Sequence, residues 1–213
     1  MSTNSSNNDR SLRVMPEQWL DPEPVTSWFS EDQPLEIDLG CGKGRFLLAR
    51  AAACKGVNFL GIERLLGRVN KLERKAQKAG LSNVRICRVE GYYATRFLIP
   101  RCSVRTYYIF FPDPWPKRKH HQHRIMNARF VDALYETLEP GGIVHFATDH
   151  LPYFYEVLSQ LKADARFEAV APFQPDDAER TDFELLFLGD KPIGRYSMVK
   201  RWNAVNAGCD CPD

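Results

Sequence analysis

The feature that most constrains this chain is a regular alternation of short apolar segments with longer helical ones. Short apolar segments predict strands at residues 35–39, 57–62, 84–89, 107–111, 143–147, 167–171 and 195–202. The segments between them predict helices at residues 46–51, 66–79, 127–138, 153–163 and 181–188. Strands that alternate with helices form a mostly parallel sheet covered on both faces. The sequence therefore predicts an α/β fold with a doubly wound, mostly parallel, seven-stranded sheet.

Breaks in this pattern divide the chain into three parts. Residues 1–34 are polar and rich in proline, and they predict a partly disordered N-terminal arm. Residues 35–203 make up the predicted domain and residues 204–213 a C-terminal tail. Within the domain, Gly80 predicts the end of a helix and Pro140–Gly142 a turn. With 213 residues, 44% of them hydrophobic and 26% charged, the chain suits a single globular domain.

The sequence shows no signal for secretion or for a membrane span. Its first residues are polar and lack the basic and apolar regions of a signal peptide, and no apolar run approaches spanning length. We therefore expect a cytoplasmic protein without a membrane partner, either a monomer or a weak homodimer. The formal net charge of +2 does not by itself indicate a nucleic-acid partner, so any such surface depends on local clusters of charge.

A glycine-rich loop follows the first predicted strand. Gly40, Gly42 and Gly44 alternate with other residues after Asp38. Glycines at these positions permit a positive φ and leave room for a ligand, and the backbone N–H groups of the next helix can meet an anion. The pyrophosphate of a dinucleotide and the carboxylate of S-adenosylmethionine both suit such a loop. The loop lacks the third glycine of GxGxxG, because Arg45 stands there, which favours S-adenosylmethionine.

Acidic residues lie at the ends of the first three predicted strands. Asp38 can face the ammonium of S-adenosylmethionine or a water bound to it, Glu63 can accept hydrogen bonds from both ribose hydroxyls, and Glu90 can reach the adenine edge. Ligands of doubly wound sheets bind beyond the carboxyl ends of the strands, which supports these roles. The alternative is that these residues only cap helices and turns, as acidic residues after strands often do.

The segment after the fourth predicted strand has the sequence FFPDPWPKRKHHQHR and begins at Phe110. Pro112 and Pro114 restrict the backbone on either side of Asp113, so its carboxylate is held at low entropic cost. Trp115 offers an aromatic face to a base or a cofactor. Residues 117–129 hold five lysines or arginines and no acid, which is the pattern of a surface that binds a phosphate backbone. The alternatives are a solvated charged face and a rigid proline turn.

The three histidines of this segment do not predict a metal site. His120, His121 and His123 are too closely spaced for a known ligand pattern, and the cysteines include no CxxC pair. Cys209 and Cys211 form a CxC pair near the end of the chain, which suits a disordered tail better than a metal or redox pair. We expect no bound metal.

The sequence resembles the tRNA (guanine-N7)-methyltransferases over residues 35–202. The resemblance rests on DLGCGKG from Asp38, GIE ending at Glu63, DPWPK from Asp113, HFATD ending at Asp149 and TDFE from Thr181. The DPWPK segment is the most specific of these motifs. The resemblance implies a Rossmann-like methyltransferase fold, S-adenosylmethionine as cofactor and tRNA as partner.

The resemblance also implies roles for particular residues. Contacts with the cofactor fall on Asp38, Glu63, Glu90 and Asp113, and contacts with tRNA or guanine fall on Lys117, Asp149, Thr181 and Glu184. In the family a basic residue usually stands where this chain has Asp182, which puts one RNA contact in doubt. The family implies the variable loop of tRNA as the site of methylation.

Methylation of guanine N7 does not require a general base, because N7 carries a lone pair and no proton. We expect catalysis mainly by alignment of N7, methyl carbon and sulfur. Asp113 is the candidate catalytic residue, because a carboxylate beside the purine stabilises its developing positive charge; Glu184 is a second candidate for that role. Lys117, Arg118, Lys119 and Arg124 are expected to position the RNA backbone, and Trp115 to stack on the exposed base.

Three other functions are compatible with parts of the sequence. A methyltransferase for a small molecule or a protein has no need of the basic segment. A dinucleotide-dependent dehydrogenase conflicts with the missing third glycine and with the lack of a Tyr-x-x-x-Lys motif. A catalytically silent RNA-binding module does not require the intact glycine loop, Glu63 and Asp113.

Overall fold

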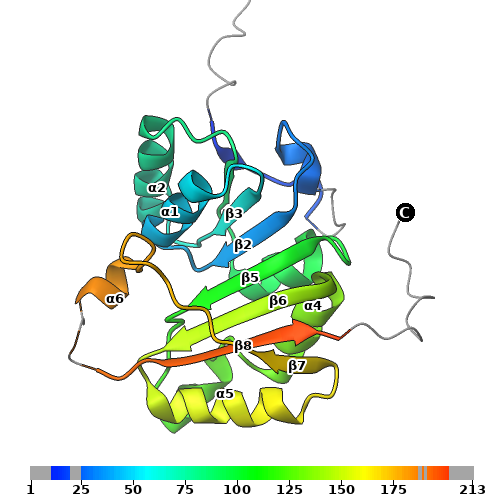
Figure 1. Cartoon of the computed structure of the whole chain (residues 1–213), viewed down its shortest axis with the longest axis vertical. Coiled ribbons are helices and arrows are strands. Elements are labelled where there is room, and N and C mark those ends of the chain that lie inside the picture. The colour runs from blue at the N-terminus through cyan, green and yellow to red at the C-terminus, as the bar shows by residue number, and fades with distance from the viewer. Residues whose placement is uncertain (1–10, 20–24, 187–188, 190, 202–213) are drawn as a thin grey trace, which may run out of the picture.

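A computed structural model describes residues 11–19, 25–186, 189 and 191–201. The fold is one eight-stranded sheet in the order β1-β4-β3-β2-β5-β6-β8-β7 (Figure 1). The strands are β1 (Arg13–Val14), β2 (Leu35–Leu39), β3 (Asn58–Ile62), β4 (Val84–Cys87), β5 (Val104–Phe110), β6 (Leu138–Thr148), β7 (Phe167–Val170) and β8 (Gly194–Lys200). All neighbouring pairs are parallel except the two that involve β8. The predicted doubly wound, mostly parallel α/β fold is therefore confirmed.

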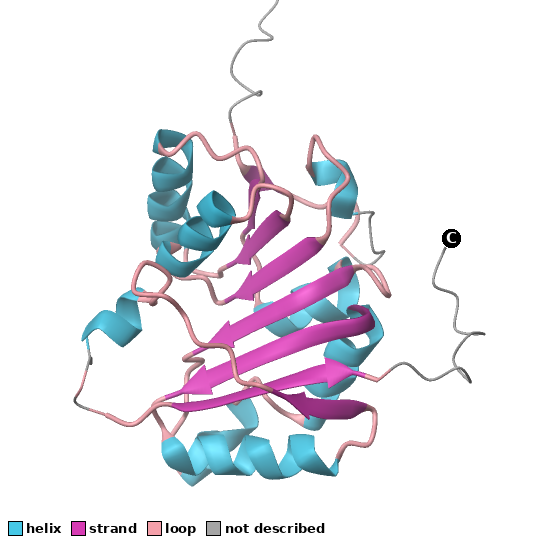
Figure 2. Cartoon of the chain, viewed as in Figure 1, coloured by secondary structure: helices cyan, strands magenta, loops and turns pink. Residues whose placement is uncertain are grey.

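Helices lie on both faces of this sheet (Figure 2). The α-helices are α1 (Arg45–Ala53), α2 (Leu66–Lys78), α3 (Gly91–Tyr93), α4 (Ala128–Thr137), α5 (Leu151–Ala163) and α6 (Asp182–Leu186). Three further helical turns are η2 (Val25–Trp28), the π-helix η3 (Ala94–Leu98) and the 3-10 helix η4 (Arg118–His123). Each predicted helix is present, with its ends shifted by a few residues.

Two apolar clusters hold the helices against the sheet. On one face, Leu47 of α1 and Leu72 of α2 are fully buried against β3 and β4. On the other, Phe130 of α4 and Tyr153 of α5 pack into the larger cluster with β5 and β6. The strands β2 and β3 are buried at every position, as expected for parallel strands covered on both sides.

The strand count and one turn were predicted wrongly. Arg13–Val14 adds an eighth strand beside β4, where the sequence predicts a partly disordered arm. The predicted turn at Pro140–Gly142 lies inside β6, which begins at Leu138. Leu138 pairs with Val104, and a register shift follows before Ile143 pairs with Thr106. Tertiary pairing with β5 therefore overrides the local turn signal, and the extra residues form an irregularity in the strand, with Gly141 at φ 79°.

Parts of two predicted regions lie outside the described residues: positions 1–10 and 20–24 of the N-terminal arm, and the whole C-terminal tail with Cys209 and Cys211. The division of the chain at residues 34 and 35 stays a prediction. Within the described part, no helix is long and apolar enough to cross a membrane.

Candidate active site

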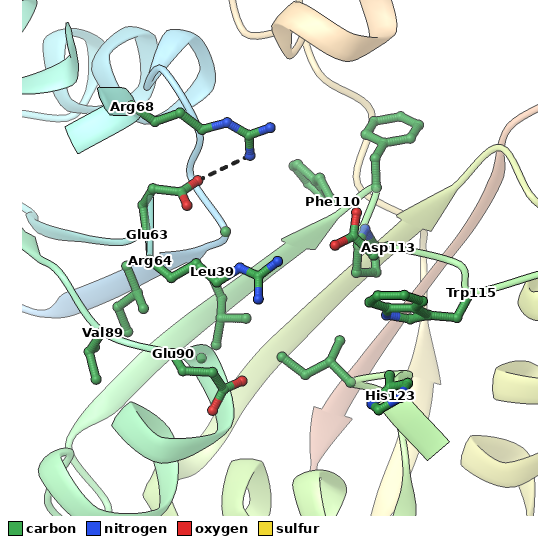
Figure 3. Close-up of a pocket in the computed structure, with 16 residues that line it drawn as sticks. Leu39, Glu63, Arg64, Arg68, Val89, Glu90, Phe110, Asp113, Trp115 and His123 are labelled. Carbon is green, nitrogen blue, oxygen red and sulfur yellow. Dashed lines mark hydrogen bonds and ion pairs between the residues drawn. The ribbon is translucent and has the colours of Figure 1, made fainter. Parts of the chain in front are cut away.

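The strand order reverses direction between β2 and β5, and a cavity of 310 Å³ lies at the carboxyl ends of these strands (Figure 3). This is the position at which doubly wound sheets bind ligands. The loops after four strands supply its lining, which includes Leu39, Gly40, Glu63, Arg64, Arg68, Glu90, Gly91, Asp113, Trp115 and His123. The cavity therefore brings together predicted residues that lie far apart in the sequence.

The glycine loop between β2 and α1 is a tight turn. Gly40, Gly42 and Gly44 have φ values of 81°, 58° and 77°, a region that side chains rarely adopt. The N–H of Gly40 donates to the carbonyl of Ile62 at 2.8 Å, which ties the loop to the end of β3. A Cβ on Gly44 would lie 2.1 Å from Leu72 Cδ1, so glycine is also required there for the contact with α2. Of the three, only Gly40 lines the cavity.

Asp38 is the penultimate residue of the buried strand β2 and lies next to Leu39 and Gly40 of the cavity lining. Its side chain is almost fully buried, and within the described residues no hydrogen bond or ion pair reaches its carboxylate. Burial, and secondarily the charge of Glu63, raise the pKa of Asp38 from 3.8 to about 8. A cation that binds beside Asp38 would favour its ionised form and so lower this pKa.

Glu63 and Glu90 both line the cavity, but each is already hydrogen-bonded. Glu63 Oε1 accepts from the N–H of Leu65 at 2.8 Å, and Oε2 pairs with Arg68 at 3.4 Å (Figure 3). Glu90 accepts from the N–H groups of Tyr92 and Tyr93 and so caps α3. Glu90 therefore caps a helix, which was the alternative to a role in binding. At Glu63, a ribose hydroxyl would compete with Arg68 for the carboxylate.

The segment after β5 presents Asp113 at the rim of the cavity. Phe111 and Trp115 take positive φ values of 51° and 42°, which are uncommon for residues with bulky side chains. This turn exposes Asp113, whose side chain points into the cavity from the side opposite Glu63 (Figure 3). Within the described residues, no hydrogen bond or ion pair occupies the Asp113 carboxylate.

The cations that follow Asp113 differ in their surroundings. Lys117 and Arg118 are exposed, as a contact with phosphates requires. Arg124 is 4% exposed, and it donates to the carbonyl of Pro114 at 2.8 Å and to Glu156. Its guanidinium also lies 4.8 Å from the centre of the Tyr153 ring. These contacts contradict the predicted phosphate contact at Arg124, because the side chain is engaged inside the protein.

His123 is a lining residue that the sequence did not single out for the site. Its ring lies 5.1 Å from that of Trp115, and His120 contacts the same indole at 5.8 Å. His120 and His123 are three residues apart in the 3-10 turn η4, so both rings lie on the side of the turn that faces Trp115. Within the described residues, no group of three or more potential metal ligands is present.

Asp149 directly follows β6, Thr181 directly precedes α6 and Glu184 lies in α6, and none of the three lines the cavity. Glu184 is buried and paired with Arg195 at the start of β8, while its second oxygen has no hydrogen-bond partner. The hydroxyl of Thr181 accepts from the N–H of Glu184, and Asp149 pairs with Lys191 at 3.4 Å. The three residues are therefore a neighbouring group rather than part of the cavity wall.

A ring contact connects α6 to the cavity. Phe183 of α6 lies 5.0 Å from Phe111, which lines the cavity. Arg45 also holds the segment before α6 through the carbonyl of Arg180 at 3.0 Å. The group around Glu184 is thus fixed beside the rim that carries Asp113.

Arg64 and Arg68 were also missed as lining residues. Arg64 reaches into the cavity from the side opposite Asp113 (Figure 3), and within the described residues its guanidinium has no hydrogen bond or ion pair. The signal in the sequence is their position, because Arg64 follows Glu63 at a strand end and Arg68 comes one helical turn later.

Comparison with known proteins identifies the class of protein to which this fold belongs. A family model described as "Putative methyltransferase" matches residues 32–182. The 16S rRNA methyltransferase KamB superposes with a TM-score of 0.61 over 84% of this chain and 94% of that chain, at 13% identity. A Streptococcus mutans methyltransferase in complex with SAH superposes with a TM-score of 0.54 over 85% and 90%, at 14% identity. At these identities the solved structures show the fold alone. Together with the family model, the fold and the position of the cavity define a methyltransferase of the Rossmann-like class.

Proteins of similar sequence identify the family within this class of methyltransferases. A tRNA (guanine-N(7)-)-methyltransferase of Halorhodospira halophila is 42% identical over 140 residues, 66% of this chain and 61% of that protein. One from Sodalis glossinidius is 35% identical over 168 residues, 76% of this chain and 70% of that protein. The chain belongs to the tRNA (guanine-N7)-methyltransferase family. The matched stretch spans less than two thirds of the Halorhodospira protein.

The methyl donor of this family is S-adenosylmethionine, and the residues around the cavity fit it. Asp38 is a buried carboxylate without a partner among the described residues, next to a cavity that a cationic ligand can enter. No atom lies within 4 Å of the position that a Cβ on Gly40 would take, so the loop leaves room for the ligand. The volume of 310 Å³ is in the range of small-molecule sites.

Proposed function

We propose that this chain transfers the methyl group of S-adenosylmethionine to N7 of a guanosine in the variable loop of tRNA and so forms 7-methylguanosine. The observation that carries the proposal is the placement of Asp113. Its carboxylate has no partner among the described residues, faces the cavity, and is joined directly to a segment of exposed cations. A methyltransferase for a small molecule or a protein does not need such a segment beside its cavity.

The cofactor roles follow from the placement of the residues. Asp38 would hold the ammonium group, because it is buried without a partner among the described residues. The loop of Gly40, Gly42 and Gly44 would receive the carboxylate at the start of α1. Glu63 would accept from the ribose hydroxyls, and Glu90 would lie at the adenine edge. When bound, the cofactor supplies an electrophilic methyl carbon on a sulfonium.

Asp113 is the catalytic residue of the proposed reaction. Guanine N7 attacks with its own lone pair, so no side chain has to remove a proton. Methylation leaves a positive charge on the purine, and a carboxylate at the cavity rim stabilises that charge as it develops. The same carboxylate can accept hydrogen bonds from guanine N1–H and N2, which selects guanine over adenine. Trp115, also at the rim, offers a surface for stacking of the base.

The remaining predicted contacts concern the RNA. Lys117 and Arg118 are exposed beside Asp113 and would position the backbone without reading its sequence. Asp149, Thr181 and Glu184 would contact the target nucleotide from the side of α6. The Phe183–Phe111 contact supports this role, because it holds α6 beside the rim. We do not assign Arg124 to the RNA.

The proposal also covers where the protein acts, its oligomeric state and its domain boundaries. A tRNA substrate fits a protein that acts in the cytoplasm. A monomer or a weak homodimer is proposed for the assembly; the exposed large apolar side chains of the described residues include two small groups, Leu65 with Leu66 at the start of α2 and Phe183 with Leu186 on α6. Residues 35–203 would form the methyltransferase domain between an N-terminal arm and a C-terminal tail.

The test is transfer of labelled methyl from S-adenosylmethionine to unmodified bulk tRNA, followed by identification of the labelled nucleoside. Label in 7-methylguanosine supports the proposal, and mapping of the position then tests the variable loop. Binding of S-adenosylmethionine without transfer to tRNA would indicate another methyl acceptor. Absence of binding would overturn the assignment of the glycine loop.

A further inference from the structure

We propose that α2 presents a second docking surface for the RNA backbone, on the side of the cavity opposite the Lys117 segment. The surface consists of Arg64, Arg68, Lys71, Lys75 and Lys78, here called the α2 stripe. The inference rests on the proposed tRNA substrate and adds a path for the RNA on a part of the molecule outside the family motifs.

Helical periodicity places Arg68, Lys71, Lys75 and Lys78 on one face of α2. They are spaced three, four and three residues apart, and such neighbours lie above one another on a helix. Arg64 stands two residues before the helix and joins the stripe through the cavity lining. All members are exposed. The buried face of α2 carries Val69, Leu72 and Ala76. The stripe runs ten residues from Arg68 to Lys78, or about 15 Å at 1.5 Å per residue.

The positive charge of the stripe is largely uncompensated. Glu73 is the only acid in α2, and it pairs with Arg13 of β1. Within the described residues, the single ion pair of the stripe is the one between Arg68 and Glu63. Like charges three or four residues apart destabilise a helix by about 0.2–0.5 kcal/mol per pair. An anionic partner along the stripe would relieve this repulsion.

The stripe begins inside the cavity lining. Arg64 and Arg68 line one side of the cavity, and Asp113, Trp115 and His123 line the other (Figure 3). The exposed cations after Asp113 continue outward from that second side. The cavity therefore lies between two cationic surfaces. A polyanion whose target base enters the cavity would meet cations on both sides of the target nucleotide.

RNA is the partner that this surface fits best. A membrane-surface helix needs a free apolar face, and the apolar face of α2 is buried against β3 and β4. A regularly spaced row of cations that begins at a base-sized cavity matches the charge of a nucleic-acid backbone, which needs no sequence readout. An acidic protein is the alternative partner, and it would leave tRNA binding unaffected by the stripe.

The test compares two double variants that remove equal charge. K71A/K78A removes two stripe cations that have no hydrogen bond or ion pair to the described part of the chain, and alanine favours the helix. K55A/K162A removes two exposed cations from the α1–β3 turn and the last turn of α5. Binding of unmodified tRNA is measured by fluorescence anisotropy across a salt series, and binding of S-adenosylhomocysteine by calorimetry checks the cavity.

We expect K71A/K78A to reduce the slope of log K against log salt by about 1.4 to 1.8, since each phosphate contact contributes about 0.7 to 0.9. With equal affinity extrapolated to 1 M salt, this is a loss of about 25- to 60-fold at 0.1 M salt. The loss should appear in transfer assays as a raised KM for tRNA. K55A/K162A should stay within about two-fold of wild type.

An unchanged salt slope for K71A/K78A, while wild type binds and methylates tRNA, would overturn the α2 surface and leave the proposed function intact. An equal loss in K55A/K162A would also overturn it, because the effect would then follow net charge and not position. A wild-type chain that neither binds nor methylates tRNA would overturn both proposals together.

Discussion

Replacement of Asp38 by asparagine should stabilise the protein at neutral pH while it removes the proposed contact with the cofactor ammonium. Asp38 is buried in β2, and no hydrogen bond or ion pair from the described residues reaches its carboxylate. Burial and the nearby Glu63 raise its pKa from 3.8 to about 8. The neutral side chain is therefore the favoured form in the folded protein, whereas the unfolded chain ionises near pH 4.

The sign and size of the effect follow from proton linkage. Between about pH 4 and pH 8 the folded state holds one proton more than the unfolded state, so the stability of the wild type falls as pH rises. The Asp38 contribution is fully present below pH 4 and is lost once pH passes 8. One proton corresponds to about 1.4 kcal/mol per pH unit. The Asp38→Asn variant lacks this proton, so its stability relative to wild type should rise by about 4 kcal/mol from pH 5 to pH 8.

The assay is urea unfolding of wild type and Asp38→Asn at several pH values from 5 to 8.5 without cofactor. The difference between the two proteins isolates the titration of Asp38 from that of every other group. Calorimetry with S-adenosylmethionine should show at least ten-fold weaker binding to the variant, because a hydrogen bond to a charged group contributes about 1.5–3 kcal/mol. A stability difference that does not change with pH would refute a protonated Asp38 in the folded protein.

Three further changes test other parts of the site. Asp113→Ala should abolish methyl transfer and leave the melting temperature nearly unchanged, since the side chain is exposed; near-normal turnover would remove it from catalysis. Arg124→Met should destabilise the protein by about 1–3 kcal/mol, because the carbonyl of Pro114 loses its cationic donor, whereas the half-exposed Glu156 stays hydrated. An equal salt slope for tRNA binding is expected, and a reduced slope would restore Arg124 as a phosphate contact. Gly44→Ala should lower the midpoint of thermal unfolding and cofactor affinity together, because its Cβ would collide with Leu72; a stable variant would show that α2 yields at that contact.

The sequence predicted those parts of the site that depend on position along the sheet. Glu63, Glu90 and Asp113 each follow a strand, and parallel strands bring their carboxyl ends to one edge, so a shared cavity could be expected from the order of the strands alone. Asp149, Thr181 and Glu184 lie beyond the cavity, and Glu184 is held there by Arg195 of the antiparallel strand β8, a contact that the order of the parallel strands does not predict. The residues that would contact cofactor and RNA remain proposals.

Other features depended on tertiary contacts that no local pattern reports. In the sequence, Arg124 and Lys117 belong to the same run of cations and cannot be distinguished. Only the packing of Arg124 against Glu156 and Tyr153 of α5 shows that Arg124 is buried. Pro140–Gly142 reads as a turn, yet pairing of Leu138 with Val104 extends the strand through it. Arg13–Val14 is too short for any periodicity, and it becomes a strand only because the edge of β4 is available.

The cavity wall has a consequence for folding cooperativity. Its lining comes from residues 39–40, 62–68, 89–91 and 110–125, four stretches of chain that lie on separate strands and loops. A ligand in the cavity contacts all of them only when the whole sheet is assembled, so its binding free energy adds to the global unfolding free energy and not to that of one loop. At a ligand concentration of one hundred times Kd this increment is about 2.7 kcal/mol. Amide hydrogens of β2, β3, β4 and β5 should then slow their exchange together, by the same factor of about one hundred.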